Sequence, residues 1–329
     1  MNHKDLVTVS GLKKYFPVEQ GMFRQTRCFI HAVDGVNFSI PVGESLSLVG
    51  ESGCGKTTTG KLLVKLHEPT GGSMQFNDGQ ESMDLAHLER KSMRSFRRKA
   101  QMIFQDPYES LNPRMTVFDA VIEPLNVQNI GNWAERERRV ADTLALVGLT
   151  PPSTFLFRFP HELSGGQRQR VAIARALVVN PIFVVADEPT SMLDVSIRTG
   201  VMNLMLELGD RFNLSYLYIT HDLAVARYMG RDLAVMYLGK IVETGNTEEV
   251  LAHGLHPYTQ ALLSAVPVPD PQVKRAAAKI KGRITAPINP PVRCRFFDRC
   301  PISDDYCLKN DHPPLEDKGA GHFTACYKV

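Results

Sequence analysis

The sequence has few features of a membrane-spanning or secreted protein. Among its 329 residues, no apolar run approaches the roughly 18 residues that a membrane-spanning helix requires. The first residues alternate charged and apolar side chains, without the continuous apolar stretch or the cleavage site of a signal peptide. We therefore expect a chain that does not itself span a membrane and that stays in the cytoplasm.

A strong excess of either charge is also missing. The 38 Lys and Arg residues against 35 Asp and Glu leave a formal net charge of +3, so composition alone does not indicate a polyanion-binding surface. The 43% hydrophobic and 22% charged residues are those of an ordinary globular protein, which excludes wholesale disorder and fibrous architectures. At about 150 residues per domain, the length allows about two domains or one elaborated domain.

The six cysteines lack the paired C-x2-C spacing of common zinc modules and the close spacing of bacterial ferredoxins. Cys28 and Cys54 stand apart and are expected to be free thiols. The other four gather near the C-terminus as Cys294-x5-Cys300-x6-Cys307-x18-Cys326. In a reducing compartment, clustered thiols favour a metal or cluster site over disulfides. Spacing alone leaves Zn²⁺ and a [4Fe–4S] cluster open, and coordination chemistry alone puts zinc slightly ahead.

The first two thirds of the chain alternates β-rich and helical runs, which predicts an α/β fold with a mostly parallel sheet. The expected strands are Val36–Ile40, Ser45–Val49, Ile182–Ala186 and Ser215–Thr220, and the expected helices are Gly55–Leu66, Val195–Arg211 and Leu223–Met229. A hairpin across Leu233–Thr244, turning at Gly239, and a short helix at Thr247–Ala252 are expected to close this core.

Composition changes along the chain predict three parts, the first of which contains an insertion. We expect a main domain over 1–265, with an inserted helical subdomain at about 106–178 that includes the charged run Ala134–Arg139. A proline-rich linker with the basic run Lys274–Lys281 is expected over 266–291. A four-cysteine module that needs a metal or cluster to fold is expected over 292–329. The polar stretch Pro17–His31 predicts a loop or hairpin.

A Gly-rich loop follows the predicted strand Ser45–Val49 and precedes a predicted helix. It matches the pattern G-x-x-x-x-G-K-[ST], in which backbone N–H groups cradle the β- and γ-phosphates of a nucleotide, the lysine adds a cation and the hydroxyl ligates Mg²⁺. The candidate nucleotide-binding residues are Gly50, Glu51, Ser52, Gly53, Cys54, Gly55, Lys56, Thr57 and Thr58.

An apolar strand at Ile182–Ala186 ends in two adjacent carboxylates, Asp187 and Glu188. A strand that delivers Asp187 to its carboxyl end places a ligand near Mg²⁺ held by a phosphate loop. Glu188, one residue later, is then expected to polarise the attacking water. No motif that reads guanine is evident, which favours ATP over GTP.

The run Leu163-Ser164-Gly165-Gly166-Gln167 resembles the signature motif of ATP-binding cassette ATPases. It predicts a second anion-binding turn at a helix N-terminus. In that family the turn caps the γ-phosphate of ATP bound to a partner subunit. The resemblance extends over about residues 6–264. It implies a phosphate-loop cassette with a RecA-like core, an antiparallel β subdomain and the inserted helical subdomain, to which the C-terminal cysteine module is added.

The same resemblance assigns roles to further residues. It implies that Tyr15, or alternatively Phe16, stacks on adenine, that Gln105 contacts Mg²⁺ and the water, and that His221 contacts the γ-phosphate. Asp194 ends the loop Ser191–Asp194, which crosses the dimer interface in the family. Met192 in this loop departs from the usual alanine, which leaves open whether both composite sites hydrolyse ATP equally well.

The segment His256–Ser264, the proline-rich stretch Ile288–Val292 and the terminal cysteines resemble the tail of dipeptide/oligopeptide importer ATPases, and most closely the second ATPase subunit. The resemblance implies a second, often non-identical ATPase subunit, two membrane permeases and an extracytoplasmic binding protein as partners. It implies a peripheral position on the cytoplasmic face of the inner membrane, and it favours the [4Fe–4S] cluster over zinc. The alternatives are a soluble cassette ATPase acting on ribosomes or DNA, and a metal-sensing module that uses ATP structurally.

Overall fold

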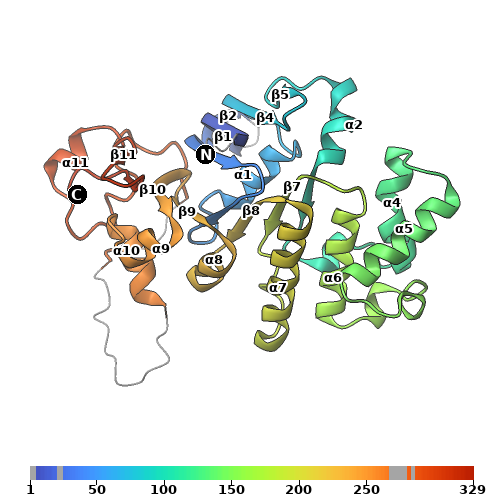
Figure 1. Ribbon diagram of the computed structural model, residues 1–329. Helices are drawn as coiled ribbons and strands as arrows, with labels where there is room; N and C mark the ends of the chain where they lie inside the picture. Colours follow the sequence, from blue (N-terminus) through green and yellow to red (C-terminus); the bar gives the residue numbers. More distant parts are fainter. Residues whose placement is uncertain (1–4, 21–24, 267–279, 283–285) are drawn as a thin grey trace, which may run out of the picture. The chain divides into compact units, whose positions relative to one another are not determined.

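The computed structural model describes residues 5–20, 25–266, 280–282 and 286–329 (Figure 1). These residues form two compact units, each assembled from separate stretches of the chain. The first unit holds Pro41–Glu44 and His87–Leu217, and the second holds Asp5–Ile40, Ser45–Ala86 and Tyr218–Val329. The expected domain boundaries at 265 and 292 do not coincide with this division and stay a prediction.

The first unit is mainly helical. A parallel pair of strands, β6 (Ala100–Ile103) and β7 (Phe183–Asp187), aligns Ala100 with Phe183. The helices are α2 (Arg90–Lys99), α3 (Pro107–Ser110), α4 (Val117–Gln128), α5 (Trp133–Leu146), α6 (Gly165–Leu177) and α7 (Val195–Phe212), with 3₁₀ turns at Pro152–Thr154 and Pro160–Glu162. The helices α3 to α6 occupy the region where the sequence predicts a helical insertion, and α4, α5 and α6 lie together in Figure 1.

Local sequence signals begin and end these helices. Thr116 and Asp119 form a capping box at the start of α4, and Asn132 and Glu135 form another at the start of α5. Such pairs satisfy backbone N–H groups that have no partner inside the helix. Asn129 ends α4 in the left-handed conformation that asparagine tolerates. The charged run 134–139 therefore belongs to a well-capped helix.

The second unit contains an antiparallel sheet in the order β2-β1-β4-β5. Its strands are β1 (Asp5–Gln20), β2 (Gln25–Pro41), β4 (Gly71–Asn77) and β5 (Ser82–Asp84). Strand β1 pairs with β4 so that Val7 lies opposite Phe76, and both side chains are fully buried. The two long strands extend into the stretch where the sequence predicts a loop or hairpin, and its central residues 21–24 lie outside the described residues.

The second unit also holds part of a larger sheet, in the order β11-β12-β10-β9-β3. These strands are β3 (Ser45–Val49), β9 (Asp232–Tyr237), β10 (Lys240–Asn246), β11 (Glu316–Asp317) and β12 (Phe323–Thr324), and the residues of β8 (Ser215–Thr220) are divided between the two units. The predicted hairpin is confirmed, because β9 and β10 pair in antiparallel fashion around Gly239. Gly239 has a φ of 84°, which glycine adopts without strain.

The helices of the second unit are α1 (Lys56–Leu63), α8 (Leu223–Met229), α9 (Thr247–Ala252), α10 (Pro257–Ala265) and α11 (Asp305–Lys309). The expected bounds of α8 and α9 are confirmed. Helix α1 differs from the expected Gly55–Leu66 at both ends. It starts at Lys56, because Gly55 caps it with a φ of 111°, outside the helical region, and it ends at Leu63.

The C-terminal segment packs against this part of the second unit. Strand β12 pairs with β10, so that Glu243 lies opposite Thr324. Phe296 is buried in a cluster with Tyr237 and Tyr258. Most of the expected proline-rich linker and its basic run lie at 267–279 and 283–285, outside the described residues. The residues 292–329 therefore share a core with β9, β10 and α10.

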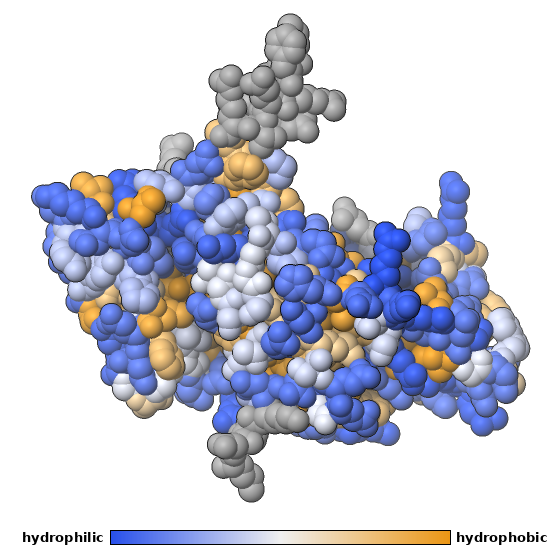
Figure 2. All heavy atoms as spheres, turned by 90° about the horizontal axis from the view of Figure 1, so that it is seen from above, coloured by the Kyte–Doolittle hydropathy of each residue, from blue (hydrophilic) through white to orange (hydrophobic). Residues whose placement is uncertain are grey.

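Hydrophilic side chains cover most of the face seen in Figure 2, and hydrophobic residues lie between them in small groups. Within the described part of the chain, no helix has the length and apolar character needed to cross a membrane.

Candidate functional site

The phosphate loop is held tightly between β3 and α1. The Lys56 side chain is almost fully buried and turns back over the loop. Its ammonium group donates hydrogen bonds to the carbonyl oxygens of Gly50 at 2.6 Å and Glu51 at 3.1 Å. A cation fixed beside a ring of backbone groups at a helix N-terminus is suited to bind phosphate.

Two glycines of the loop have no room for a side chain. A Cβ at Gly50 would lie 2.1 Å from the carbonyl oxygen of Met236, and one at Gly55 would lie 2.0 Å from that of Ala32. Gly53, in contrast, has open space but a φ of 78°. The glycine pattern therefore reflects close backbone packing at two positions and backbone conformation at the third.

Cys54 occupies a variable position of the loop and is buried. Burial raises the pKa of its thiol above the ordinary value. Cys54 and Cys28 are both free thiols, as expected.

The carboxylate pair lies at the end of β7, whose residues are all buried. Asp187 is buried, and the backbone of Glu188 has a φ of 45°, a conformation that a residue with a side chain rarely adopts. The side-chain amide of Gln105 donates a hydrogen bond of 3.1 Å to the Glu188 carboxylate. The structure thus brings together two residues that the sequence predicts for catalysis, 83 positions apart.

The signature run forms the N-terminus of α6. Ser164 is the N-cap, and its hydroxyl accepts a hydrogen bond of 3.3 Å from the backbone N–H of Gln167. The Gln167 side chain accepts one of 3.0 Å from the backbone N–H of Ser164. The 13-residue helix α6 begins here, so the positive end of its dipole and its first free N–H groups lie at this turn. This geometry agrees with the predicted anion-binding turn.

The loop Ser191–Asp194 connects β7 to α7. Asp194 is the N-cap residue of α7. Met192 of this loop is 60% exposed and Val195, the first residue of α7, is 78% exposed, so two neighbouring apolar side chains are exposed here. In the second unit, His221 is exposed and follows β8 directly.

The predicted adenine platform, Tyr15, makes specific contacts on β1. Its ring stacks on His31, with centroids 3.9 Å apart and an interplanar angle of 20°. Its hydroxyl donates a hydrogen bond of 2.5 Å to Asp34. Burial, and then the Asp34 carboxylate, raises the pKa of this hydroxyl. Phe16, the alternative, contacts His67 edge to face.

The candidate residues are divided between the two units. The phosphate loop, Tyr15 and His221 belong to the second unit, whereas Gln105, the signature turn, the carboxylate pair and Asp194 belong to the first. Two residues that touch the phosphate loop escape the sequence motifs. Tyr258 accepts a hydrogen bond of 2.9 Å from the backbone N–H of Glu51, and Arg299 pairs with the Glu51 carboxylate. They lie more than 200 positions away, and no pattern in the sequence relates them to the loop.

The four terminal cysteines influence one another electrostatically. Burial, and to a smaller extent Cys300, Cys326 and Cys307, raise the pKa of Cys294 to about 11. Because such influence falls with distance, the four thiols lie in one neighbourhood. Among the described residues, however, no three His, Cys, Asp or Glu side chains converge to hold a metal ion. The geometry therefore does not support the expected zinc or iron–sulfur centre by itself.

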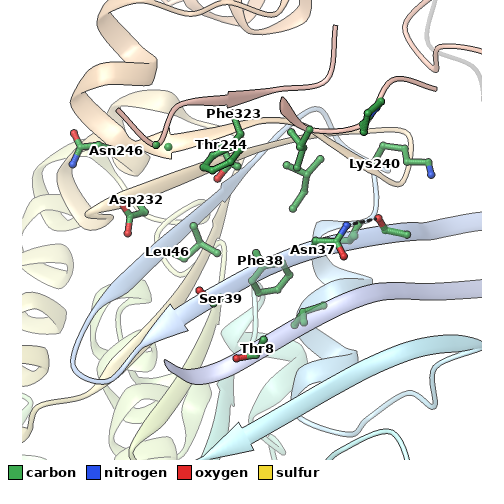
Figure 3. Close-up of a pocket in the computed structure, with 18 of the residues that line it drawn as sticks. Thr8, Asn37, Phe38, Ser39, Leu46, Asp232, Lys240, Thr244, Asn246 and Phe323 are labelled. Carbon is green, nitrogen blue, oxygen red and sulfur yellow. Dashed lines mark hydrogen bonds between the residues drawn. The ribbon is translucent and has the colours of Figure 1, made fainter. Parts of the chain in front are cut away.

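A separate cavity of about 950 Å³ lies in the second unit between β1, β2, β9, β10 and the C-terminal segment (Figure 3). Phe38 and Phe323 line it from opposite sides, together with polar groups such as Lys240 and Asp232. None of the residues predicted for nucleotide binding lines it.

Comparison with family models finds two matches. Residues 33–191 match the ABC transporter model, and residues 242–307 match the C-terminal region of oligopeptide/dipeptide transporters. The second match includes three of the four terminal cysteines and Arg299.

Curated relatives match along the whole chain. The chain is 47% identical over 328 residues to an oligopeptide transport ATP-binding protein of Bacillus subtilis, covering 99% of this chain and 98% of the relative. It is 44% identical to a dipeptide transport ATP-binding protein of Haemophilus influenzae, covering 98% and 97%.

Solved structures agree on the fold. A dimeric ATP-binding cassette in a post-hydrolysis state, bound to ADP and Pi, has a TM-score of 0.63 and 29% identity, covering 73% of this chain and 98% of that one. A component of a Clostridium perfringens ABC transporter complex has a TM-score of 0.63 and 27% identity, covering 76% and 92%. With its phosphate loop, carboxylate pair and signature turn, the chain belongs to the ATP-hydrolysing ATP-binding subunits of ABC transporters, in the oligopeptide/dipeptide branch.

Proposed function

We propose that the chain uses ATP hydrolysis to power the import of dipeptides or oligopeptides. The observation that carries this proposal is the similarity to an oligopeptide transport ATP-binding protein over 99% of the chain, which includes the C-terminal region outside the cassette. The soluble ATPase acting on ribosomes or DNA is not favoured, because the curated relatives reported above are transport proteins and the net charge is only +3.

Tyr15, the phosphate loop and His221 of the second unit, together with Asp187 of the first unit, would bind ATP and its Mg²⁺. Tyr15 stacks on adenine, Lys56 and the loop N–H groups hold the β- and γ-phosphates, and Thr57 and Asp187 are ligands for Mg²⁺. When bound, Mg²⁺ neutralises charge on the phosphates. His221 contacts the γ-phosphate. The loop geometry and the Lys56 hydrogen bonds support these roles.

Glu188 would orient the water that attacks the γ-phosphate. Its carboxylate accepts a hydrogen bond from Gln105, which fixes one oxygen and leaves the group able to accept a proton from water. The unusual backbone conformation of Glu188 supports a functional role, because strain of this kind gathers at active sites. Gln105 then links the water to the helical insertion.

The signature turn would complete the site of another ATPase subunit. Ser164, Gly165, Gly166 and Gln167 cap the γ-phosphate of ATP bound to the partner, and the loop to Asp194 meets the same interface. The N–H groups at the start of α6 and the exposed apolar side chains of Met192 and Val195 support this arrangement. ATP binding would then close the pair of subunits.

The partners proposed are a second ATPase subunit, non-identical to this one, two permeases and an extracytoplasmic binding protein. The chain would attach to the cytoplasmic face of the inner membrane through the permeases. Cargo would pass through those partners and would not touch this chain.

We also propose that Cys294, Cys300, Cys307 and Cys326 hold a [4Fe–4S] cluster. The effect of the thiols on one another's pKa values supports one shared site for the four thiolates.

Metal analysis tests the cluster. Protein purified without oxygen should contain iron and acid-labile sulfide and show visible absorption, and Cys300→Ser should lose them, whereas Cys28→Ser should keep them. Stoichiometric zinc without iron would support the alternative, and neither metal would contradict both.

Transport measurements test the proposed function. The chain is co-expressed with peptide permeases and a peptide-binding protein, and uptake of a labelled dipeptide is measured. We expect uptake with the wild-type chain, loss with Lys56→Ala and near-normal uptake with Lys61→Ala, a lysine on the same helix outside the loop. Uptake that is independent of Lys56 would contradict the proposal.

A further inference from the structure

Arg299 forms a two-point ion pair with the phosphate loop. Its two terminal nitrogens donate hydrogen bonds of 2.6 Å and 3.0 Å to the two carboxylate oxygens of Glu51, the second residue of the loop. The side chains are only 9% and 24% exposed. Paired, charge-assisted hydrogen bonds of this kind are directional and stronger than neutral ones. They hold the side chain of Glu51 in one orientation.

An aromatic cluster supports the same contact. The Arg299 guanidinium lies over the rings of Tyr237, at 5.6 Å, and Phe296, at 5.9 Å. The Tyr258 ring packs on both aromatic residues, and its hydroxyl oxygen accepts a hydrogen bond from the backbone N–H of Glu51. Glu51 is therefore fixed through its side chain and its backbone.

A second arginine of the same segment, Arg295, contacts residues beside Tyr15, the predicted adenine platform. Arg295 forms an ion pair with Asp34, and the side chains are only 8% and 11% exposed. The other oxygen of Asp34 accepts the hydrogen bond from Tyr15. Although burial acts to raise it, the pKa of Asp34 is lowered to about 2 by this hydrogen bond and by Lys240 and Arg295. Arg295 thus fixes the Asp34 carboxylate, which in turn orients the Tyr15 ring.

Both arginines lie beside cysteines. Arg295 directly follows Cys294, and Arg299 directly precedes Cys300. The residues between them form a compact turn, in which the backbone N–H groups of Arg299 and Cys300 both donate to the carbonyl oxygen of Phe296. The order of this turn fixes the positions of both guanidinium groups.

We propose that Arg299 and Arg295 are positioning residues of the ATP site, through which the C-terminal cysteine segment sets the affinity for ATP. Arg299 acts on the phosphate loop through Glu51, and Arg295 acts on the adenine platform through Asp34 and Tyr15. A loop fixed before binding loses less conformational entropy when it closes on phosphates. The proposal rests on the proposed roles of the phosphate loop and Tyr15, and it adds a source of control outside the cassette.

Affinity measurements on the full chain test the proposal. We expect Arg299→Gln to weaken ATP binding about tenfold, as the loss of a buried two-point ion pair predicts, with kcat at saturating ATP within about twofold of the wild type. Tripolyphosphate, which lacks the base, separates the two arginines. Arg299→Gln should weaken its binding as much as that of ATP, whereas Arg295→Gln should weaken only ATP binding.

Arg293→Gln is the matched control. Arg293 lies on the same segment and pairs with Asp298 at 2.8 Å and 2.9 Å, but not with the nucleotide site. It should bind ATP like the wild type. The exchange Glu51→Arg with Arg299→Glu should recover at least part of the affinity that each single change loses. Thermal melting identifies any variant that fails to fold, and Arg299→Lys, which keeps the charge without the two-point geometry, should give an intermediate affinity.

Two results would overturn the proposal. One is unchanged ATP affinity in a folded Arg299→Gln variant, and the other is an equal loss in Arg293→Gln, which would indicate a general loosening of the segment. A wild-type chain that binds ATP no better than Lys56→Ala would instead overturn the proposed function, and this inference with it.

Discussion

Gly55 shows how a single residue of the phosphate loop combines two constraints. Its φ of 111° is unfavourable for a residue with a side chain, and a Cβ would lie 2.0 Å from a backbone oxygen. The motif predicts glycine here for phosphate binding, but the structure adds a second reason, which is the approach of the Ala32 backbone. A change at this residue therefore affects folding and binding together.

We predict that Gly55→Ala lowers the free energy of unfolding by about 3 kcal/mol or more, because both the clash with backbone and the strained φ must be relieved. Chemical denaturation measures this change. Gly71→Ala is the control, since its Cβ would meet no atom closer than 3.8 Å. Equal stability of Gly55→Ala and the wild type would contradict the close packing described for the loop.

Two buried histidines predict sensitivity to acid. Burial lowers the pKa of His256 to about 3, and burial together with neighbouring cations lowers that of His312 to about 3. The unfolded chain protonates these histidines near pH 6.5, whereas the folded chain does so only near pH 3. Each neutral histidine therefore contributes fully to the free energy of unfolding above pH 6.5, and this contribution declines as pH falls toward 3. Within this range, each of the two histidines should lower the free energy of unfolding by about 1.4 kcal/mol for every pH unit of acidification.

Unfolding measured between pH 6.5 and pH 3 checks this prediction. His256 also caps α10, since its Nδ1 accepts a hydrogen bond of 3.0 Å from the backbone N–H of Tyr258. His256→Asn keeps a capping acceptor and should give a shallower loss of stability in acid. His253→Asn, at an exposed position, should keep the wild-type slope. Identical slopes for all three proteins would show that burial of His256 does not cause the sensitivity.

At the scale of the element, prediction succeeds where a signal is local. Helices α8 and α9 begin and end where the sequence predicts, because Asp222 and Asn246 cap them and apolar residues follow at helical spacing. Strand β7 is displaced by one residue, since its last position is the carboxylate Asp187 and not an apolar residue. The sequence predicts a loop or hairpin at Pro17–His31 and a short strand at Val36–Ile40, whereas β1 and β2 are long neighbouring strands that extend into that stretch. Their length depends on the pairing between them and not on local composition.

The glycines of α7 give a test at this scale. A Cβ at Gly200 would meet no atom closer than 3.8 Å, so Gly200→Ala should raise the free energy of unfolding by about 0.5–1 kcal/mol through helix propensity. At Gly209 the Cβ would lie 3.2 Å from the buried ring of Tyr216, so the same change should bring a smaller gain or a loss. Thermal or chemical unfolding distinguishes them, and a larger gain at Gly209 would contradict the packing of α7 on β8.

At the scale of the whole molecule, the motifs predict where the nucleotide binds but not the contacts that hold the phosphate loop. The phosphate loop, signature turn and carboxylate pair are recognisable because each is a short run with a fixed chemical task. The pairing of Glu51 with Arg299 joins positions 248 residues apart, and such a contact follows only from the folded arrangement of the chain. The C-terminal segment was expected as a separate module, yet β12 pairs with β10 and Phe296 packs in the core of the second unit.

The central claim, that this chain hydrolyses ATP with Glu188 as the residue that activates water, is tested most directly by Glu188→Gln. Hydrolysis and ATP binding are measured on the same preparation of wild-type and variant protein. We predict that the rate falls at least about 100-fold, because the amide cannot accept the proton, while ATP is still bound. Hydrolysis at the wild-type rate in Glu188→Gln would contradict the account.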